Sequence, residues 1–228
     1  MLRMEDVTVS GALDCASFSA ADGSFISLFV EDEEAVEPIA RTLAGLARPD
    51  SGRLFIDNVD AARLKPSLRG KWLALMPGDP RGHLVSGFTV MENMSLAYAY
   101  GDGRLFRNAP GGMEAGLFRA ALAEMGMAAA LDVQAAGLMP EQGCLAALRM
   151  ALLAQPKALV VVEPRVLTSA RSRAYLRAVW KFTRVQLVTT VLVTPGEDAA
   201  KAFGDRCYRV SAGRIILEPI AGGAASLL

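Results

Sequence analysis

The feature that most constrains the fold is the alternation of short apolar runs with longer stretches of helical periodicity. Continuous apolar runs, typical of buried strands, stand at residues 24–30, 158–162 and 187–193. Segments 90–98 and 170–182 instead carry apolar residues at three- and four-residue spacing, as amphipathic helices do. Strands that alternate with helices predict a parallel sheet covered on both faces. The sequence therefore predicts an α/β fold.

An all-helical insert is expected to divide the two halves of this sheet, because the periodicity is helical from about residue 88 to residue 153. Pro38 is expected at the first position of a helix over residues 39–46. Residues from 221 on are rich in Gly, Ala and Ser, which predicts a mobile tail. The remaining strands are expected at 2–9, 15–20, 53–56, 73–76, 206–210 and 214–217.

Composition excludes several classes of protein. The 228 residues are 52% apolar, which is ample for one medium domain with a large core. No apolar run reaches the roughly 20 residues that a membrane-spanning helix needs. The 24 acidic and 24 basic residues argue against a nucleic-acid binder. Cys15, Cys144 and Cys207 are too few and too widely spaced to indicate a disulfide framework or a metal site.

Eight short stretches of the chain form a pattern by their order and spacing: Ala12-Leu13-Asp14, Asp22-Gly23-Ser24-Phe25, Thr42-Leu43-Ala44-Gly45-Leu46, Pro49-Asp50-Ser51-Gly52, Thr89-Val90-Met91-Glu92-Asn93, Pro156-Lys157-Ala158-Leu159, Glu163-Pro164 and Gly204-Asp205-Arg206. In this order and spacing they resemble the ATP-binding subunits of ABC transporters. The resemblance covers about residues 2–217. Within the family, the stretch from Glu92 to Gly101 is most similar to ATPases of tryptophan- or tyrosine-type uptake systems.

The resemblance implies an ABC-ATPase (P-loop NTPase-like) fold. Such a fold has a parallel sheet core, an N-terminal antiparallel β subdomain and an inserted helical subdomain. The implied layout is one domain over residues 1–220, followed by a flexible tail over 221–228. The core is expected at 1–80 and 155–220, and the helical subdomain at about 81–154.

The phosphate-binding loop of the family departs from its pattern in this chain. A working loop has glycines whose N–H groups close around phosphates, a lysine that reaches them, and a Ser or Thr that holds magnesium. Residues 30–38 contain no glycine, Val36 stands in the lysine position, and Glu37 and Pro38 replace the hydroxyl pair. The vestigial loop positions are Val30, Glu33, Ala35, Val36, Glu37 and Pro38.

Carboxylates fill the same window: Glu31, Asp32, Glu33, Glu34 and Glu37. Two like charges about 4 Å apart repel by roughly 4 kcal/mol at an effective dielectric constant near 20, so ATP in the usual pose is disfavoured. The acids are expected instead to cap the N-terminus of the following helix, which carries partial positive charge and free N–H groups. Metal binding by the acids is a lesser alternative.

The other functional positions of the family are also altered. Gly78 stands at the Q-loop glutamine, Val162 at the Walker B aspartate and Pro195 at the switch histidine, and the signature reads Leu138-Met139-Pro140-Glu141-Gln142. Glu163 matches the catalytic base and is regarded as vestigial, with local capping or pairing as its expected role. These departures predict no catalytic residues, no metal site and no cofactor, with ATP and magnesium binding lost.

The leading functional hypothesis is a pseudo-ATPase that serves as structural or regulatory partner of a membrane permease or of a competent ATPase subunit. A homodimer stays open, and no nucleic-acid partner is expected. One alternative is an unorthodox but active ATPase that energises uptake of a small solute such as an amino acid; another is a soluble regulator of an ATPase. The chain is expected in the cytoplasm or at the inner face of the cell membrane. Permease docking is implied at Gly78, Asp79, Pro80, Arg81, Val85, Phe88 and Met91.

Overall fold

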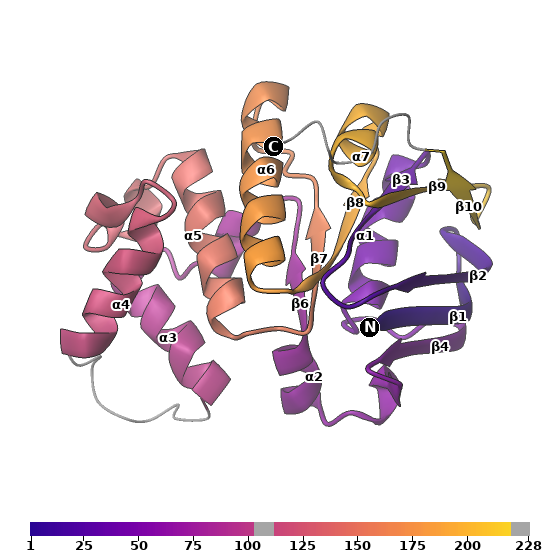
Figure 1. The fold of residues 1–228 in the computed structure, drawn as a ribbon, viewed down its shortest axis with the longest axis horizontal. Helices are drawn as coiled ribbons and strands as arrows, with labels where there is room; N and C mark the ends of the chain where they lie inside the picture. Colours follow the sequence, from indigo (N-terminus) through magenta and orange to yellow (C-terminus); the bar gives the residue numbers. More distant parts are fainter. Residues whose placement is uncertain (103–111, 220–228) are drawn as a thin grey trace. The chain divides into compact units, whose positions relative to one another are not determined.

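The computed structural model describes residues 1–102 and 112–219 of the chain (Figure 1). It forms two compact units, described separately below. The core unit comprises residues 1–78, 156–163 and those from 179 on, and the helical unit comprises 79–155 and 164–178. Residues 164–178 were expected in the core, and the structure groups them with the helical unit instead. The expected tail at 221–228 lies outside the described residues.

The core unit is built on a six-stranded sheet of order β10-β9-β3-β8-β7-β6. Neighbouring strands are parallel except for β10, which pairs antiparallel with β9. Every residue of β3, β7 and β8 is buried, which explains why these segments show continuous apolar runs rather than alternation. The strands are β3 (Phe25–Val30), β6 (Leu73–Met76), β7 (Ala158–Val162), β8 (Thr189–Thr194), β9 (Arg206–Ser211) and β10 (Arg214–Glu218).

A second, antiparallel sheet of the core unit has the order β2-β1-β4-β5. Its strands are β1 (Leu2–Val9), β2 (Leu13–Ala20), β4 (Ser51–Ile56) and β5 (Val59–Asp60). Asp57 and Asn58 connect β4 to β5 with φ angles of 49° and 63°. Positive φ at both central residues is the requirement of a type I′ turn, which matches the twist of the paired strands. The ABC-ATPase architecture expected from the resemblance, with its parallel core and antiparallel β sheet, is thus present.

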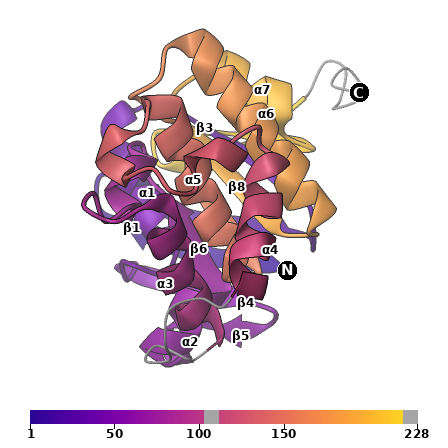
Figure 2. The ribbon, with the colours of Figure 1, turned by 90° about the vertical axis from the view of Figure 1, so that its left-hand side faces the viewer.

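Three helices belong to the core unit: α1 (Glu33–Leu43), α2 (Pro66–Trp72) and α7 (Glu197–Phe203). A 3₁₀ turn, η1 (Ala61–Arg63), precedes α2. Helices α1 and α7 lie on opposite faces of the six-stranded sheet (Figures 1 and 2). Helix α1 buries the apolar residues of one side against the sheet: Ala35, Val36, Ile39, Ala40 and Leu43.

The prediction of a helix at residues 39–46 with Pro38 at its first position is wrong. Helix α1 begins at Glu33 and ends at Leu43, and Pro38 lies inside it. The Asp32 side chain starts the helix earlier because it accepts a hydrogen bond from the Glu34 N–H at 3.0 Å. The helix stops because Gly45 has φ +67°, with N–H groups of Gly45 and Leu46 bonded back into the last turn.

The helical unit contains α3 (Val90–Asp102), α4 (Gly112–Ala123), α5 (Pro140–Leu153) and the first part of α6 (Ser169–Val185). Short 3₁₀ segments join them: η2 (Pro80–His83), η3 (Ala128–Ala130) and η4 (Ala135–Gly137). Tyr98 meets Phe118 edge to face with ring centroids 5.8 Å apart, next to the fully buried Met94 and Leu122. Across the described residues, none of these helices, nor any in the core unit, combines the length and apolarity needed to cross a membrane.

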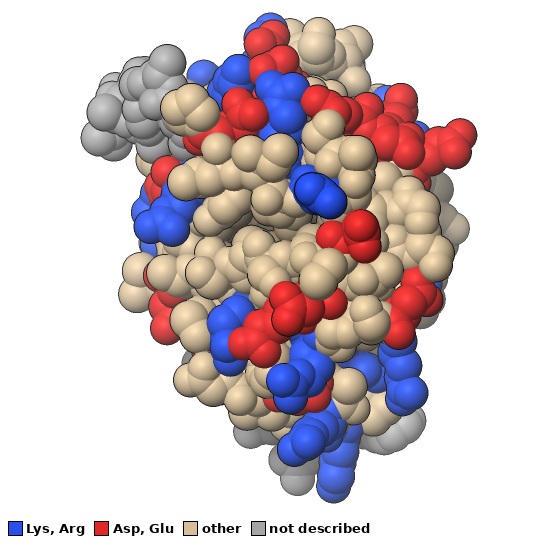
Figure 3. Space-filling view, turned by 90° about the vertical axis from the view of Figure 1, so that its right-hand side faces the viewer, with Lys and Arg blue, Asp and Glu red and all other residues tan. Residues whose placement is uncertain are grey.

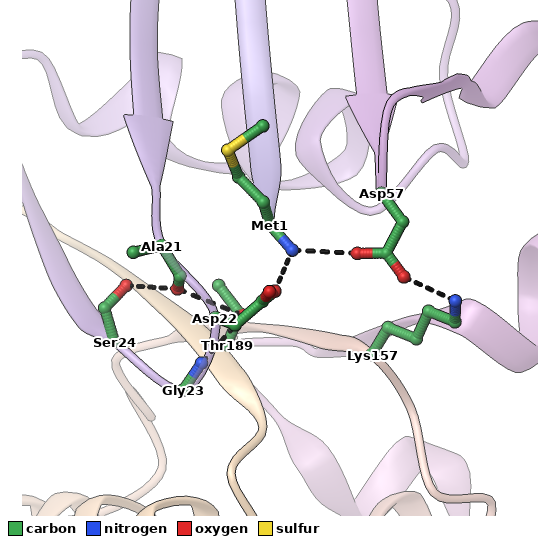
Figure 4. A network of polar contacts seen from close by, with 8 residues as sticks. All are labelled: Met1, Ala21, Asp22, Gly23, Ser24, Asp57, Lys157 and Thr189. Atoms are coloured by element: carbon green, nitrogen blue, oxygen red, sulfur yellow. Dashed lines mark hydrogen bonds and ion pairs between the residues drawn. The ribbon is translucent and has the colours of Figure 1, made fainter.

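A polar network joins the antiparallel sheet to the six-stranded sheet within the core unit (Figure 4). The α-amino group of Met1 donates to Asp57 at 2.8 Å and also to Asp22. The second carboxylate oxygen of Asp57 accepts from Lys157, whose ammonium lies 3.8 Å from the centre of the Trp72 ring. These contacts hold the pKa of Asp57 below its usual range, with the Lys157 hydrogen bond as the largest cause.

Candidate functional site

The candidate site lies where the parallel strands β3, β7 and β8 end. In open α/β sheets, ligands bind beyond the carboxyl ends of the strands. Glu31 follows β3, Glu163 follows β7, and Pro195 follows β8. Parallel pairing of β8 with both β3 and β7 brings these three strand ends to one edge of the sheet.

The loop between β3 and α1 uses its own backbone donors internally. The Asp32 carboxylate accepts from the Glu34 N–H at 3.0 Å, and the Asp32 carbonyl accepts from the Ala35 N–H at 3.0 Å. The Glu31 N–H donates to the carbonyl of Val210 at 3.2 Å. The expected capping of the helix by an acidic side chain is therefore seen at Asp32.

The residues named as loop positions do not converge on one site. Val30, Ala35 and Val36 are 1%, 3% and 0% exposed and pack in the main core cluster. Glu33 and Glu37 are exposed, and Pro38 is half-buried in the second turn of α1. Because α1 starts at Glu33, these residues are helical: Ala35 and Val36 lie on the side that faces the core, and Glu33 and Glu37 lie on the side that faces solvent.

Arg209 on β9 neutralises part of the acidic charge at this loop. Its guanidinium pairs with Glu31 at 2.8 Å, Glu218 at 2.7 Å and Glu197 at 3.3 Å, and it lies 5.1 Å from the centre of the Phe29 ring. Hydrogen bonds from Ser211 and Arg209 lower the pKa of Glu31, and the pKa of Arg209 is raised in turn. The negative charge that these carboxylates present to an anion such as ATP is thus smaller than the sequence suggests.

Sequence reasoning missed Arg209, because it lies 178 positions from Glu31. The parallel register of β3 and β9, which places Phe29 opposite Arg209, brings the two side chains together. No local pattern of the sequence carries that register. The local sign that could have drawn attention to Arg209 is its position as a basic residue within the strand-like run at 206–210.

A hollow of about 510 Å³ opens beside the loop. It lies between the β1–β2 turn, the start of α1 and the β9–β10 turn, and acidic side chains gather at the upper right of the face shown in Figure 3. Three carboxylate residues, Asp14, Glu31 and Asp32, are among its walls. The other lining residues are Gly11, Ala12, Leu13, Val30, Ala35, Val210, Ala212 and Gly213.

Glu163, at the position of the family's catalytic base, has a structural partner in the core unit. The hydroxyl of Thr194 donates to its carboxylate, and the same hydroxyl oxygen accepts from the Gly196 N–H at 2.9 Å. Val162, at the Walker B aspartate position, is 3% exposed within β7. Pro195, at the switch position, is exposed and has no side-chain donor or acceptor.

The altered signature residues start helix α5 in the helical unit. Pro140 is the first residue of that helix, a position that suits proline because its N–H would be unbonded anyway. The Met139 N–H donates to the Gln142 side chain at 3.0 Å, and Glu141 pairs with Arg171 at 2.5 Å. These residues thus act locally as a helix start.

Most of the residues named for permease docking lie in one segment of the helical unit, which is held by hydrogen bonds between its own residues. The Arg81 guanidinium donates two hydrogen bonds to Asp79, at 2.9 and 2.8 Å, while Pro80 is buried. Met91 is half-buried at the start of α3. Gly78, which is also in the set, belongs to the core unit and is the last residue of the stretch 1–78.

The loop before α3 presents two apolar side chains to solvent. Val85 is 46% and Phe88 40% exposed. Asn93, which is fully buried, holds this loop: its side-chain amide donates to the carbonyl of Val85 at 3.1 Å, and its amide oxygen accepts from the Val85 N–H at 2.7 Å. The exposed apolar residues therefore stand on an ordered loop.

The loop residues present do not match the phosphate chemistry of an ABC cassette. The N–H groups of Glu31, Glu34 and Ala35 already have partners, and the lysine position is a buried valine. Among the described residues, no group of three or more His, Cys, Asp or Glu could hold a metal ion.

Comparison with known proteins gives the sequence relationship. No protein-family model matches the chain. It is 29% identical over 205 residues to the sulfate/thiosulfate import ATP-binding protein of Chromobacterium violaceum, covering 90% of this chain and 53% of that protein. It is 25% identical over 207 residues to the tyrosine transport ATP-binding protein of Clostridioides difficile, covering 89% and 81%. It is 28% identical over 211 residues to a lipoprotein-releasing system ATP-binding protein of Chlorobaculum tepidum, covering 89% and 83%.

Solved structures with this fold are ABC cassettes. A dimeric structure of the ATP-binding cassette MJ0796 in a post-hydrolysis state with ADP and phosphate has a TM-score of 0.76, 20% identity, and coverage of 97% of this chain and 100% of that one. The protein cbiO1 of Clostridium perfringens, part of the ABC transporter complex cbiONQ, has a TM-score of 0.78, 18% identity, and coverage of 96% and 88%.

These relatives contradict one sequence prediction. The departures from the family motifs predicted that no cofactor is used, with ATP and magnesium binding lost. That prediction is wrong, because the relatives that match about 90% of the chain are ATP-binding proteins, and a cassette of the same fold holds ADP and phosphate. Missing motif residues were too narrow a basis for excluding a cofactor. By sequence and by fold, the chain is similar to the ATP-binding subunits of ABC transporters.

Proposed function

We propose that the chain is a subunit of an ABC transport system that contributes through assembly rather than through its own hydrolysis of ATP. Its partner is a membrane permease or a second, competent ATP-binding subunit. The relatives named for import and release systems support the transport context. A dimeric cassette and a cassette of a larger complex, both with this fold, support a role in assembly.

The observation that carries this proposal is the contact of Thr194 with Glu163. Hydrolysis needs a group that orients and deprotonates the attacking water. The Glu163 carboxylate stands in the position of that group, but it accepts a hydrogen bond from a fully buried hydroxyl. The neighbouring positions are the hydrocarbon of Val162 and the ring of Pro195, neither of which moves a proton.

The surface proposed for docking a permease comprises Gly78, Asp79, Pro80, Arg81, Val85, Phe88 and Met91. Exposed apolar side chains on an ordered loop are typical of a surface that a partner covers. Val85 and Phe88 have this character, since Asn93 holds the loop by both its amide groups. The carboxylate–guanidinium pair of Asp79 and Arg81 gives the same segment a polar rim.

Release of phosphate from MgATP by the purified chain tests the proposal. We expect turnover far below the roughly 1 s⁻¹ at the low end for enzymes, and the same rate in Glu163→Gln. Nucleotide affinity is measured separately, because a chain that binds ATP without turning it over agrees with the proposal. A rate in the enzyme range that Glu163→Gln abolishes would support instead an active ATPase energising solute uptake.

Docking is tested by co-purification with the permease subunit encoded nearest to its gene. The double variant Val85→Ser/Phe88→Ser is expected to lower recovery of the complex at least tenfold. The matched control is Leu117→Ser, which also removes an exposed apolar side chain, 52% exposed, from the helical unit. Equal recovery with both variants would exclude this docking surface.

A further inference from the structure

A second hollow of the core unit, about 400 Å³ in volume, lies at the C-terminal end of α1. Its walls come from the end of α1, the following loop, β4, η1 and α2. The helix N-terminus and the β3–α1 loop contribute nothing to it. The lining residues are Thr42, Gly45, Ala47, Arg48, Pro49, Gly52, Arg53, Leu54, Asp60, Ala61, Ala62, Arg63 and Arg69.

Four arginines line this hollow, against the single carboxylate of Asp60. Arg53 lies 3.8 Å from Glu5, and Arg63 lies 4.0 Å from Asp60, at the limit of an ion pair. Arg48 and Arg69 have no acidic partner within the described residues. Asp60 also has a structural task, since it accepts from the Ala62 N–H at 2.9 Å. Basic side chains gather at the lower end of the face in Figure 3, at the height of α2 in Figure 1.

A residue with a buried hydroxyl that has no partner also lines the hollow. Thr42 is 1% exposed, and its Oγ1 has no hydrogen-bond partner in the structure. A threonine inside a helix ordinarily donates to the carbonyl three or four residues before it. This oxygen lies behind the wall of the hollow rather than on its surface, so the arginine side chains supply the donors there.

The side-chain stem of Arg69 lies against Gly45, just after the end of α1. Gly45 has φ +67°, and a Cβ added there would lie 2.9 Å from Cδ of Arg69 and 3.3 Å from its Cγ. Glycine is therefore needed both for the left-handed turn and for the passage of the arginine stem. Arg69 is half-buried, so its guanidinium is presented from a fixed stem rather than from a free surface chain.

We propose that this hollow binds a phosphate-bearing anion, held by Arg48 and Arg69. The guanidinium is a planar fork of donors that matches phosphate oxygens two at a time. The phosphate group comes from a free small molecule or from a lipid head group, and the proposal stands independently of whether the chain hydrolyses ATP.

Calorimetric titration with pyrophosphate at about 0.15 M ionic strength tests the site, because nonspecific surface attraction is screened there. Arg48→Ala/Arg69→Ala is expected to weaken binding at least tenfold. The matched control is Arg173→Ala/Arg177→Ala on the exposed face of α6, which changes the net charge equally and leaves the affinity unchanged. If both double variants weakened pyrophosphate binding equally, the attraction would come from overall charge, and the proposed site would be wrong.

Flotation with vesicles identifies the source of the phosphate. Binding to phosphatidylglycerol vesicles but not to phosphatidylcholine vesicles, lost in Arg48→Ala/Arg69→Ala, assigns the site to a lipid head group. Pyrophosphate binding without vesicle binding assigns it to a free ligand. Binding to neither probe overturns the proposal.

Discussion

The hydroxyl of Thr194, the last residue of β8, donates a hydrogen bond to the carboxylate of Glu163, the first residue after β7. Thr194 is fully buried, and its oxygen also accepts from the Gly196 N–H at 2.9 Å. One side chain thereby joins the ends of two neighbouring parallel strands to the start of α7. The contact links the Glu163 carboxylate to the buried end of β8.

Thr194→Val is expected to destabilise the protein by about 1–3 kcal/mol, because it removes the acceptor of the Gly196 N–H and the hydroxyl that donates to Glu163. Urea denaturation monitored by tryptophan fluorescence measures the free energy of unfolding. Thr194→Ser keeps the hydroxyl and should recover most of that loss. Valine keeps the methyl group and loses the hydroxyl, whereas serine does the reverse, so destabilisation by serine as large as that by valine would show that the hydrogen bonds contribute no more than the methyl packing.

Asp32→Ala is expected to lower the free energy of unfolding by about 1 kcal/mol, the usual effect of losing a helix N-cap. The structural reason is the 3.0 Å bond from the Glu34 N–H to the Asp32 carboxylate. Asp32→Ser and Asp32→Asn retain an acceptor and serve as controls. Thermal unfolding that is the same for alanine, serine and asparagine would contradict the capping role.

The Asp57 network makes stability depend on pH at the acid end. Hydrogen bonds from Lys157 and the Met1 amino group lower the pKa of Asp57 in the folded state. A lowered folded pKa contributes stability that is fully present above the unfolded value of about 3.9 and is lost as the pH falls through the folded value. The difference in unfolding free energy between the parent and Asp57→Asn should therefore shrink as the pH falls below about 4.

Urea denaturation between pH 6 and pH 2.5 measures this difference. Asparagine is a suitable replacement, because residue 57 has φ 49° and asparagine tolerates the left-handed region. Asp198→Asn, which also removes one exposed carboxylate, is the matched control. A parent-to-variant difference that stays constant over this range would show that the network is not coupled to protonation of Asp57.

The three cysteines are expected to differ in reactivity. Cys15 is exposed, whereas Cys144 and Cys207 are buried. Burial raises the pKa of Cys144 to about 11 and also raises that of Cys207. With a pKa near 11, roughly 0.1% of Cys144 is thiolate at pH 8, and the thiolate is the reactive form.

A disulfide reagent at pH 8 should therefore label one thiol quickly and the other two only after unfolding. Cys15→Ser removes the fast phase. Two fast thiols in the folded protein would show that the helical unit or β9 opens more readily than its packing indicates.

The sequence by itself determined the elements whose character is local. Continuous apolar runs predicted β7 at Ala158–Val162 and β6 at Leu73–Met76 with their bounds, because strands buried on both faces need no polar alternation. Helical spacing predicted α3 to α6, though their ends shifted by a few residues. Helices α2 and α7 were missed, since seven residues are too few to establish a period.

Tertiary structure decided what depends on partners distant in the sequence. Proline favours the first turn of a helix and is disfavoured in its interior, so the sequence alone placed the start of the helix at Pro38. In the structure the Glu34 N–H donates to Asp32, α1 starts at Glu33, and Pro38 lies inside the helix. The pairing of Arg209 with Glu31 follows from the parallel register of β9 and β3, and the pairing of Thr194 with Glu163 from that of β8 and β7. Hydrophobic periodicity follows from the order of residues in the sequence, whereas strand register is fixed by the packing of the whole sheet.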